Sequence, residues 1–156
     1  MTFMKKPTIE EVKKLIESHA SIVNLGSPPD AVDDEWIVKA EAALNRPLPD
    51  SYKWFLKEYR GGEIGGYEIY SIYGMPFESA VGGDIVYHHR LNSKSGLLGD
   101  SKLVVCETDL DETFFFEYTE FWDGECPIYL WFPSGSLHYA DNFYEFLYKR
   151  ITEYSS

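Results

Sequence analysis

The sequence is short of basic residues and of cysteine, and it has no long apolar run. It contains 14 Lys and Arg against 26 Asp and Glu, which gives a formal net charge of -12 at pH 7. Nucleic acids and anionic membrane surfaces are recognised by clustered Lys and Arg, so this balance disfavours both as ligands. Two cysteines, Cys106 and Cys126, are too few for a disulfide framework and indicate a reducing compartment.

The sequence also lacks the segments that mark membrane insertion, secretion or division into several domains. No stretch approaches the ~20 apolar residues that a membrane span needs. The first residues lead into a charged helical segment, not into the apolar run of a signal peptide. We therefore expect a cytoplasmic protein without a membrane partner. The length of 156 residues is ordinary for one domain, and no repeat or linker divides it, so we expect a single domain over residues 1–156.

Lys and Arg are missing altogether from one long interval, between Lys102 and Lys149. Acidic residues are frequent there, namely Glu107, Asp109, Asp111, Glu112, Glu117, Glu120, Asp123, Glu125, Asp141 and Glu145. One explanation is that acidity keeps the protein soluble. The other is a specific acidic face for a basic partner, which would relieve the repulsion among these charges.

Three amphipathic helices are predicted in the first 60 residues, at 8–17, 33–44 and 49–59. Thr8 and Glu11 have the spacing of a capping box at the start of the first helix. Apolar side chains recur at helical spacing in all three, and Tyr and Phe dominate the third. The segment between the first two helices contains glycine and proline and is predicted to be a connector.

The second half of the sequence changes to strand-like segments rich in aromatic and β-branched residues. The predicted strands are residues 67–73, 102–107, 113–118, 127–132 and 137–139. Residues 84–91 favour a helix, Asp123-Gly124 is a turn signal, and residues 142–151 form a closing helix. The order predicts an α+β fold with a mostly antiparallel sheet packed against N-terminal helices and a C-terminal helix.

The most specific pattern lies between Asp33 and Gly62. It consists of a Glu-x-x-Leu element, a Leu-Pro break, a Tyr-x-x-Phe-Leu helix and a Gly-Gly stop, which begin at Glu41, Leu48, Tyr52 and Gly61. Leu48 can pack inward while Pro49 starts the next helix, and the glycines permit the reversal into a strand. This order resembles the SUKH superfamily, which includes fungal Smi/Knr cell-wall regulators and many bacterial immunity proteins.

The resemblance implies a Smi/Knr-like fold and a role in binding protein. Bacterial members of the superfamily bind a cognate secreted toxin, often a nuclease. The expected function is therefore an immunity protein (antitoxin) that binds the basic C-terminal domain of a polymorphic toxin and inhibits it by occluding its active site. The alternative is a regulatory protein-binding scaffold of the Smi/Knr type without a toxin partner. An enzyme acting through scattered carboxylates is a third, weaker hypothesis. The superfamily has no common catalytic residues, so no catalytic residue and no cofactor is expected.

The candidate contact surface is the acidic stretch in which aromatic residues are interleaved. Aromatic anchors within a charged rim suit a tight interface, although the same rings could be core residues on strand faces. The candidate partner-binding residues are Glu107, Asp109, Asp111, Glu112, Glu117, Glu120, Trp122, Asp123 and Glu125.

Other reactive groups give no catalytic or metal-binding pattern. His88 and His89 are adjacent, so their side chains point apart and make poor metal ligands; they are predicted to be surface or capping histidines. The acidic residues from Asp109 resemble the start of a calcium loop, but Phe114 replaces the required glycine. The two cysteines are predicted to be small buried side chains.

Overall fold

The computed structural model describes residues 6–96 and 98–155. In these ranges the helices are α1 (Ile9–Ser18), α2 (Asp34–Leu44), α3 (Asp50–Tyr59), α4 (Ile85–Ser95) and α5 (Phe143–Tyr154), with short 3-10 helices η1 (Pro28–Asp30) and η2 (Tyr118–Glu120). The helices predicted from the sequence are all present. α1 begins with the predicted capping box between Thr8 and Glu11, and the side chains of Asp84 and Asn142 cap α4 and α5.

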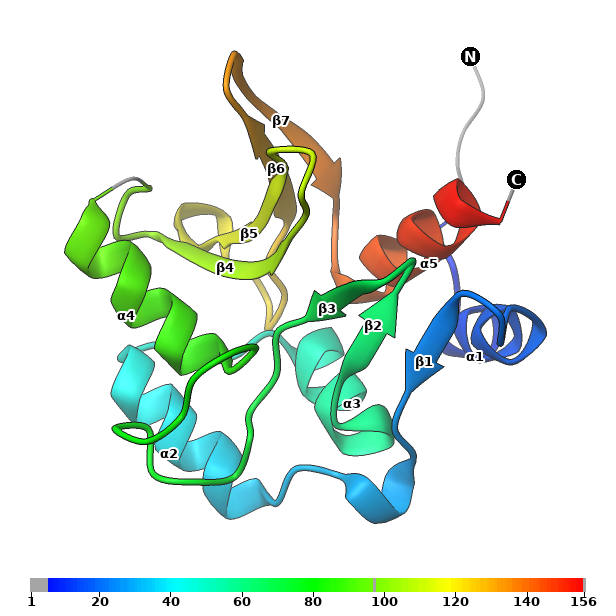
Figure 1. Ribbon diagram of the computed structural model, residues 1–156, viewed down its shortest axis with the longest axis horizontal. Coiled ribbons are helices and arrows are strands. Elements are labelled where there is room, and N and C mark those ends of the chain that lie inside the picture. The colour runs from blue at the N-terminus through cyan, green and yellow to red at the C-terminus, as the bar shows by residue number, and fades with distance from the viewer. Residues whose placement is uncertain (1–5, 97, 156) are drawn as a thin grey trace.

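One antiparallel sheet runs through the molecule (Figure 1). Its strands are β1 (Val23–Leu25), β2 (Gly62–Ile64), β3 (Tyr67–Ile69), β4 (Lys102–Glu107), β5 (Thr113–Glu117), β6 (Ile128–Phe132) and β7 (Gly135–Ala140). The spatial order of the strands is the same as their order in the sequence. Each strand therefore pairs with its neighbours in the chain, and the predicted α+β fold with an antiparallel sheet is confirmed.

The sheet extends further toward the N-terminus than the sequence predicts. β1 lies within the predicted connector, and β2 begins at Gly62, where only a helix stop was expected. The predicted strand at residues 67–73 ends at Ile69. Strands of three residues are too short to show an alternating pattern, which explains why β1 and β2 escape detection. Gly62 has a φ of +141°, and a Cβ there would collide with the backbone oxygen of Asn24, so glycine permits the pairing of β1 with β2.

The break between α2 and α3 is held by the motif residues themselves. The carboxylate of Glu41 accepts a hydrogen bond from the backbone N–H of Leu48 at 2.7 Å. Asn45 ends α2 in the left-handed conformation, with φ of 57°, which asparagine tolerates better than most residues. Leu48 is 1% exposed. The Glu-x-x-Leu and Leu-Pro elements thus act together to turn the chain into α3.

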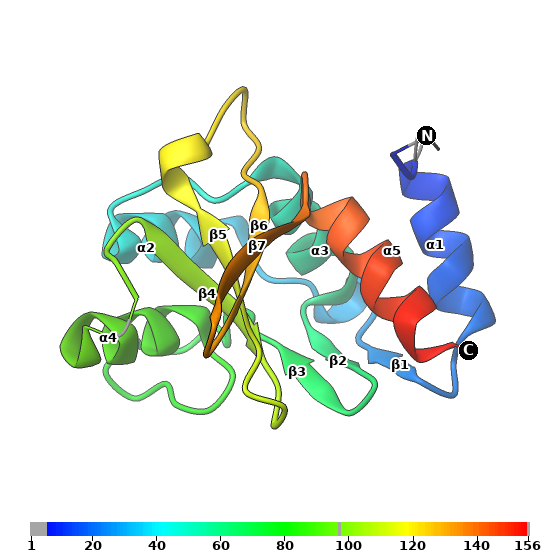
Figure 2. The ribbon, with the colours of Figure 1, turned by 90° about the horizontal axis from the view of Figure 1, so that it is seen from above.

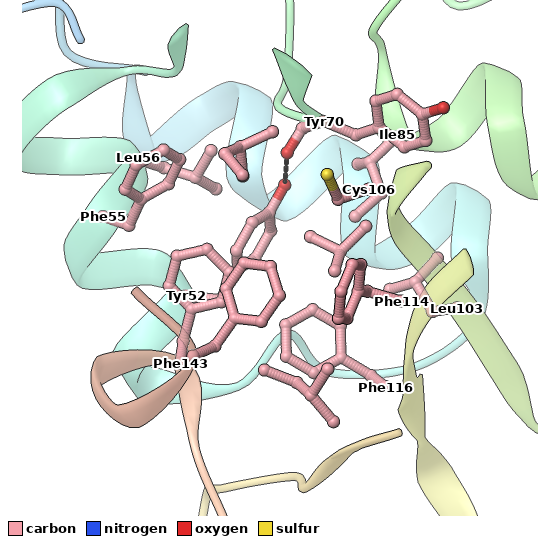
Figure 3. Packing of buried hydrophobic residues seen from close by; sticks show 14 of the residues in the cluster. Tyr52, Phe55, Leu56, Tyr70, Ile85, Leu103, Cys106, Phe114, Phe116 and Phe143 are labelled. Atoms are coloured by element: carbon pink, nitrogen blue, oxygen red, sulfur yellow. Dashed lines mark hydrogen bonds between the residues drawn. The ribbon is translucent and has the colours of Figure 1, made fainter. Parts of the chain in front are cut away.

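The core is centred on Tyr52 of α3, which is fully buried (Figure 3). Its ring lies 5.1 Å from that of Phe143 and 5.5 Å from that of Phe116, both in edge-to-face geometry. Its hydroxyl donates a hydrogen bond to the carbonyl of Tyr70 at 2.6 Å. Tyr52 therefore joins α3 to the sheet and to α5, and its polar atom is satisfied inside the core.

The remaining helices cover different parts of the sheet. α1 lies beside α5 in both views, and the two helices pack against each other (Figures 1 and 2). α4 packs against β4 and also contacts α2. In the described part of the chain, no helix combines the length and apolar character that crossing a membrane requires.

The two cysteines are buried, as the sequence predicts. Cys106 and Cys126 are unpaired and have no exposed surface. Burial raises the pKa of each thiol to about 12. Both side chains are therefore neutral thiols at pH 7, which is the form least reactive toward electrophiles and oxidants.

The prediction that His88 and His89 are surface or capping residues is wrong for His89, which is buried, whereas His88 is partly exposed. His89 is 9% exposed and belongs to a helix that packs against β4 and α2. The ring of His88 stacks on that of Tyr70 at 3.7 Å with an interplanar angle of 6°. Burial lowers the pKa of both histidines below 6.5, and the nearby Arg46 lowers that of His89 further.

These histidines predict a loss of stability in mild acid. The unfolded chain takes up protons below about pH 6.5, whereas the folded protein resists protonation until its lowered pKa values are reached. The free energy of unfolding should be at its full value above pH 6.5 and fall as the pH is lowered, by at most about 1.4 kcal/mol per pH unit for each histidine. His89→Leu should reduce this slope in urea denaturation between pH 5 and 7. The variant His138→Gln, at an exposed position, is the control, and an unchanged slope in His89→Leu would contradict the assignment.

Candidate protein-binding surface

The nine candidate residues fall into two groups at opposite ends of β5 (Figure 2). The pairing of Thr113 with Glu107 marks one end, and the pairing of Glu117 with Lys102 marks the other. The five residues of β5 separate these ends by roughly 14 Å. The first group, around the β4–β5 loop, is Glu107, Asp109, Asp111 and Glu112. The second, around the β5–β6 connection, is Glu117, Glu120, Trp122, Asp123 and Glu125.

Glu117 is part of the framework of the second group and does not offer a free charge. It is 9% exposed, and its carboxylate lies 2.8 Å from the ammonium of Lys102 on the paired strand. Burial alone would raise the pKa of Glu117, but hydrogen bonds from Lys102, Ser101 and Thr119 outweigh it, and the pKa is lowered. The carboxylate is thus ionised and already neutralised within the protein.

Glu125 caps helix α3 from outside the helix. Its carboxylate accepts hydrogen bonds from the backbone N–H of Ser51 at 3.0 Å and from the Ser51 hydroxyl at 2.6 Å. The helix needs this external cap because its N-cap residue, Pro49, makes no side-chain capping bond. The Ser51 hydroxyl in turn accepts a hydrogen bond from the backbone N–H of Phe143 at 2.9 Å. Burial raises the pKa of Glu125, and the residue connects the β5–β6 connection to α3 and α5.

Residues Trp122–Glu125 form a tight turn, here called the Trp122 turn. Two backbone hydrogen bonds join Trp122 and Glu125, at 2.9 and 3.0 Å. Asp123 and Gly124 both have positive φ, 50° and 79°, which is the requirement of a type I′ turn and confirms the predicted turn. The Gly124 carbonyl accepts a hydrogen bond from the backbone N–H of Asp50 at 2.8 Å. The turn is therefore anchored to the start of α3 by backbone as well as by Glu125.

Trp122 protrudes from this turn and is 82% exposed, more than any other large apolar side chain in the described residues. Figure 2 shows the β5–β6 connection projecting from the molecule. In the same connection, the rings of Tyr118 and Phe121 stack at 5.6 Å with an interplanar angle of 5°. The Tyr118 hydroxyl donates to the carbonyl of Pro47 at 2.7 Å. Because the backbone of the turn is held by its hydrogen bonds, little backbone freedom is lost when the indole is bound.

Three carboxylates lie close to the Trp122 turn. Asp123 belongs to it, and the exposed Glu120 precedes it and accepts a hydrogen bond from Tyr129 at 2.7 Å. Asp50 lies against the turn from α3, because a Cβ on Gly124 would collide with its carboxylate. We call Trp122, Glu120, Asp123 and Asp50 the Trp122 surface. Asp50 was not among the candidates, and its only signal in the sequence is its place as the acidic first residue of a helix.

The carboxylates at the other end of β5 are partly occupied by hydrogen bonds within the protein. Glu107 accepts a hydrogen bond from the hydroxyl of Tyr70 at 2.9 Å. Asp109 accepts one from the hydroxyl of Tyr67, and Glu112 accepts one from the hydroxyl of Thr108 at 3.1 Å. Asp111 has a positive φ of 60° in the β4–β5 loop. These residues form a second acidic region that is separate from the Trp122 surface.

The chemistry of the Trp122 surface suits binding. Its charged groups are the carboxylates of Glu120, Asp123 and Asp50, of which Asp50 also lies 3.6 Å from the ammonium of Lys53. Its apolar part is one large ring. In the ranges that the structure describes, no three His, Cys, Asp or Glu side chains are grouped closely enough to hold a metal ion. Such an arrangement provides an aromatic anchor within an acidic rim, the pattern of a protein interface.

Comparison with known families agrees with the fold and with the motif. A family model described as SMI1-KNR4 cell-wall, SUKH_5, matches residues 8–152. The match begins at the N-cap of α1 and ends within α5, so it includes every strand of the sheet. It also contains the motif that starts at Glu41 and ends at Gly62. The chain belongs to the SUKH family of SMI1-KNR4 proteins.

Proposed function

We propose that the protein is an immunity protein that binds a cognate secreted toxin domain, a nuclease, and inhibits it by occluding its active site. The observation that carries this proposal is the Trp122 surface, where an 82% exposed tryptophan stands among carboxylates on a fixed turn. Membership of the SUKH family supports a protein partner.

The charge of the protein favours a nuclease as the toxin. A nuclease binds phosphate, so its active site carries basic residues. A protein with a net charge of -12 is attracted to such a surface over a long range, which accelerates association. The carboxylates of the Trp122 surface would take the places that phosphates occupy in the substrate. Because this acidic surface would lie against the basic residues of the nuclease active site, the bound protein would block access of the substrate.

A regulatory scaffold of the Smi/Knr type is the second candidate function. The description of the matching family, SMI1-KNR4 cell-wall, favours it. A scaffold would use the same surface to bind cellular proteins, and its partners would keep their activity. Neutralisation of a toxin therefore distinguishes the two functions.

Co-expression tests the immunity function directly. The protein would be produced together with a basic nuclease toxin domain encoded beside its own gene. We expect cell growth to be restored, nuclease activity to be lost in vitro, and a stable complex to elute from gel filtration. If neither neutralisation nor a complex is observed with the neighbouring toxin domain, the antitoxin function is wrong.

Charge reversal tests the electrostatic part of the proposal. The double variant Glu120→Lys/Asp123→Lys should slow association with the toxin domain about tenfold at low salt and flatten its salt dependence. The control is Glu10→Lys/Glu17→Lys on exposed positions of α1, which changes the net charge by the same amount. Stopped-flow association rates between 20 and 500 mM salt provide the measurement. Equal slowing in both double variants would show that only total charge matters and that the contact lies elsewhere.

A further inference from the structure

A cavity of about 340 Å³ lies between α4 and the sheet, at the Thr113 end of β5. Its walls are mainly apolar, and its polar groups include one carboxylate. The lining includes His88, Leu91, Leu98, Val104, Glu107 and Thr113. The volume is near the lower end of the range for small-ligand pockets, which is enough for one long side chain.

The carboxylate of Glu107 is held in position at this cavity. The Tyr70 hydroxyl donates a hydrogen bond to Oε1 at 2.9 Å, and Nδ1 of His88 lies 3.5 Å from the same oxygen. The rings of Tyr70 and His88 stack on each other, so both contacts come from one rigid pair. Within the described ranges, both contacts use Oε1, which leaves Oε2 free to accept another hydrogen bond. The Glu107 side chain is 47% exposed.

The charge of Glu107 is not neutralised by the protein. Burial lowers the pKa of His88 below 6.5, so this ring is neutral at pH 7. No Lys or Arg of the described residues forms an ion pair with Glu107. The cavity therefore combines apolar walls with a net negative charge at one point.

A side chain that fits this arrangement has an apolar stem and a cationic end. Leu91, Leu98 and Val104 provide surface for methylene groups, while Glu107 provides the partner for a charged head, as long basic side chains require. We propose that this cavity binds a long basic side chain, arginine or lysine, from a protein partner. The proposal rests on the proposed function in one respect, because the basic toxin domain would supply that side chain.

Small cationic probes test the cavity without the toxin. n-Butylguanidinium and n-butylammonium would be titrated into the full protein carrying ¹³C-labelled Leu and Val methyl groups. We expect saturable shifts of the Leu91, Leu98 and Val104 methyl signals, and the probe of higher affinity identifies arginine or lysine as the preferred side chain. n-Butanol and butyrate, which share the stem but not the charge, should bind more weakly.

The variant Glu107→Gln isolates the carboxylate, because Gln keeps the shape and an acceptor for Tyr70. It should weaken both cationic probes about threefold or more, whereas Glu120→Gln, at the opposite end of β5, should leave them unchanged. Absence of saturable shifts, or equal affinity for n-butanol and for the cations, would overturn the proposal.

A second measurement separates this proposal from the proposed function. Glu107→Gln should weaken binding of the toxin domain about threefold or more, with the folded spectrum retained. If the cationic probes bind but no toxin is neutralised, the cavity is a site for basic side chains and the antitoxin function is wrong. If the toxin is neutralised but the probes do not bind, the Trp122 surface is the interface and the cavity proposal is wrong.

Discussion

Trp122→Ala should weaken binding of the toxin domain about 30-fold to 1,000-fold and leave the stability of the free protein unchanged. Exposed aromatic anchors that become buried at the centre of an interface contribute about 2–4 kcal/mol each. Trp122 is 82% exposed in the free protein, so its removal costs few internal contacts. Isothermal titration calorimetry gives the affinity, and urea denaturation gives the free energy of unfolding.

A matched substitution makes this result specific. Leu137 on β7 is also exposed, at 47%, and Leu137→Ala removes apolar surface away from the Trp122 surface. It should leave the affinity unchanged. The variant Trp122→Phe retains part of the ring and should fall between the wild type and Trp122→Ala. An affinity of Trp122→Ala within threefold of wild type would mean that the interface does not include this turn.

Phe143→Ala should reduce the free energy of unfolding by about 3–5 kcal/mol, which is the cost of removing a large buried ring. Phe143 is fully buried at the start of α5. Its ring lies 5.0–6.0 Å from four other aromatic rings, those of Phe55, Tyr52, Phe146 and Phe116. The same residue donates its backbone N–H to Ser51, a hydrogen bond that alanine can also make, so the variant reports on the loss of the ring.

The control for this prediction is the same substitution at a less buried phenylalanine. Phe77 is partly buried and contacts the ring of Trp36 at 5.7 Å. Phe77→Ala removes the same atoms and should cost clearly less. Urea denaturation of both variants provides the comparison. Similar losses in the two variants would show that Phe143 has no special place in the core.

Most of the fold can be predicted from local patterns. The helices are recognisable because their apolar residues repeat with the helical period and because Thr8 and Asn142 are strong N-caps. β4 begins and ends where its apolar run predicts, at Lys102 and Glu107. β1 and β2 cannot be predicted in this way, because three residues show no period and the pairing depends on the close approach of Gly62 to Asn24.

The candidate site is predicted less completely, for reasons that lie in tertiary structure. The exposure of Trp122 follows from its place beside a turn signal. The burial of Glu117 depends on its pairing across the sheet with Lys102, and the capping role of Glu125 depends on the docking of the turn on Ser51. Neither contact is local in sequence. A run of acidic residues along one segment therefore divides into structural carboxylates and exposed ones.

The packing of α1 against α5 has a consequence for synthesis on the ribosome. The buried face of α1 includes Val12 and Ile16, and its partner helix is the last element of the chain, roughly 125 residues later. At about 5–20 residues per second, α1 emerges about 6–25 s before α5 has been made. The strands can pair with their neighbours in turn as they appear, but the first helix has to wait for the last. During this interval the apolar face of α1 is available to chaperones instead of the core.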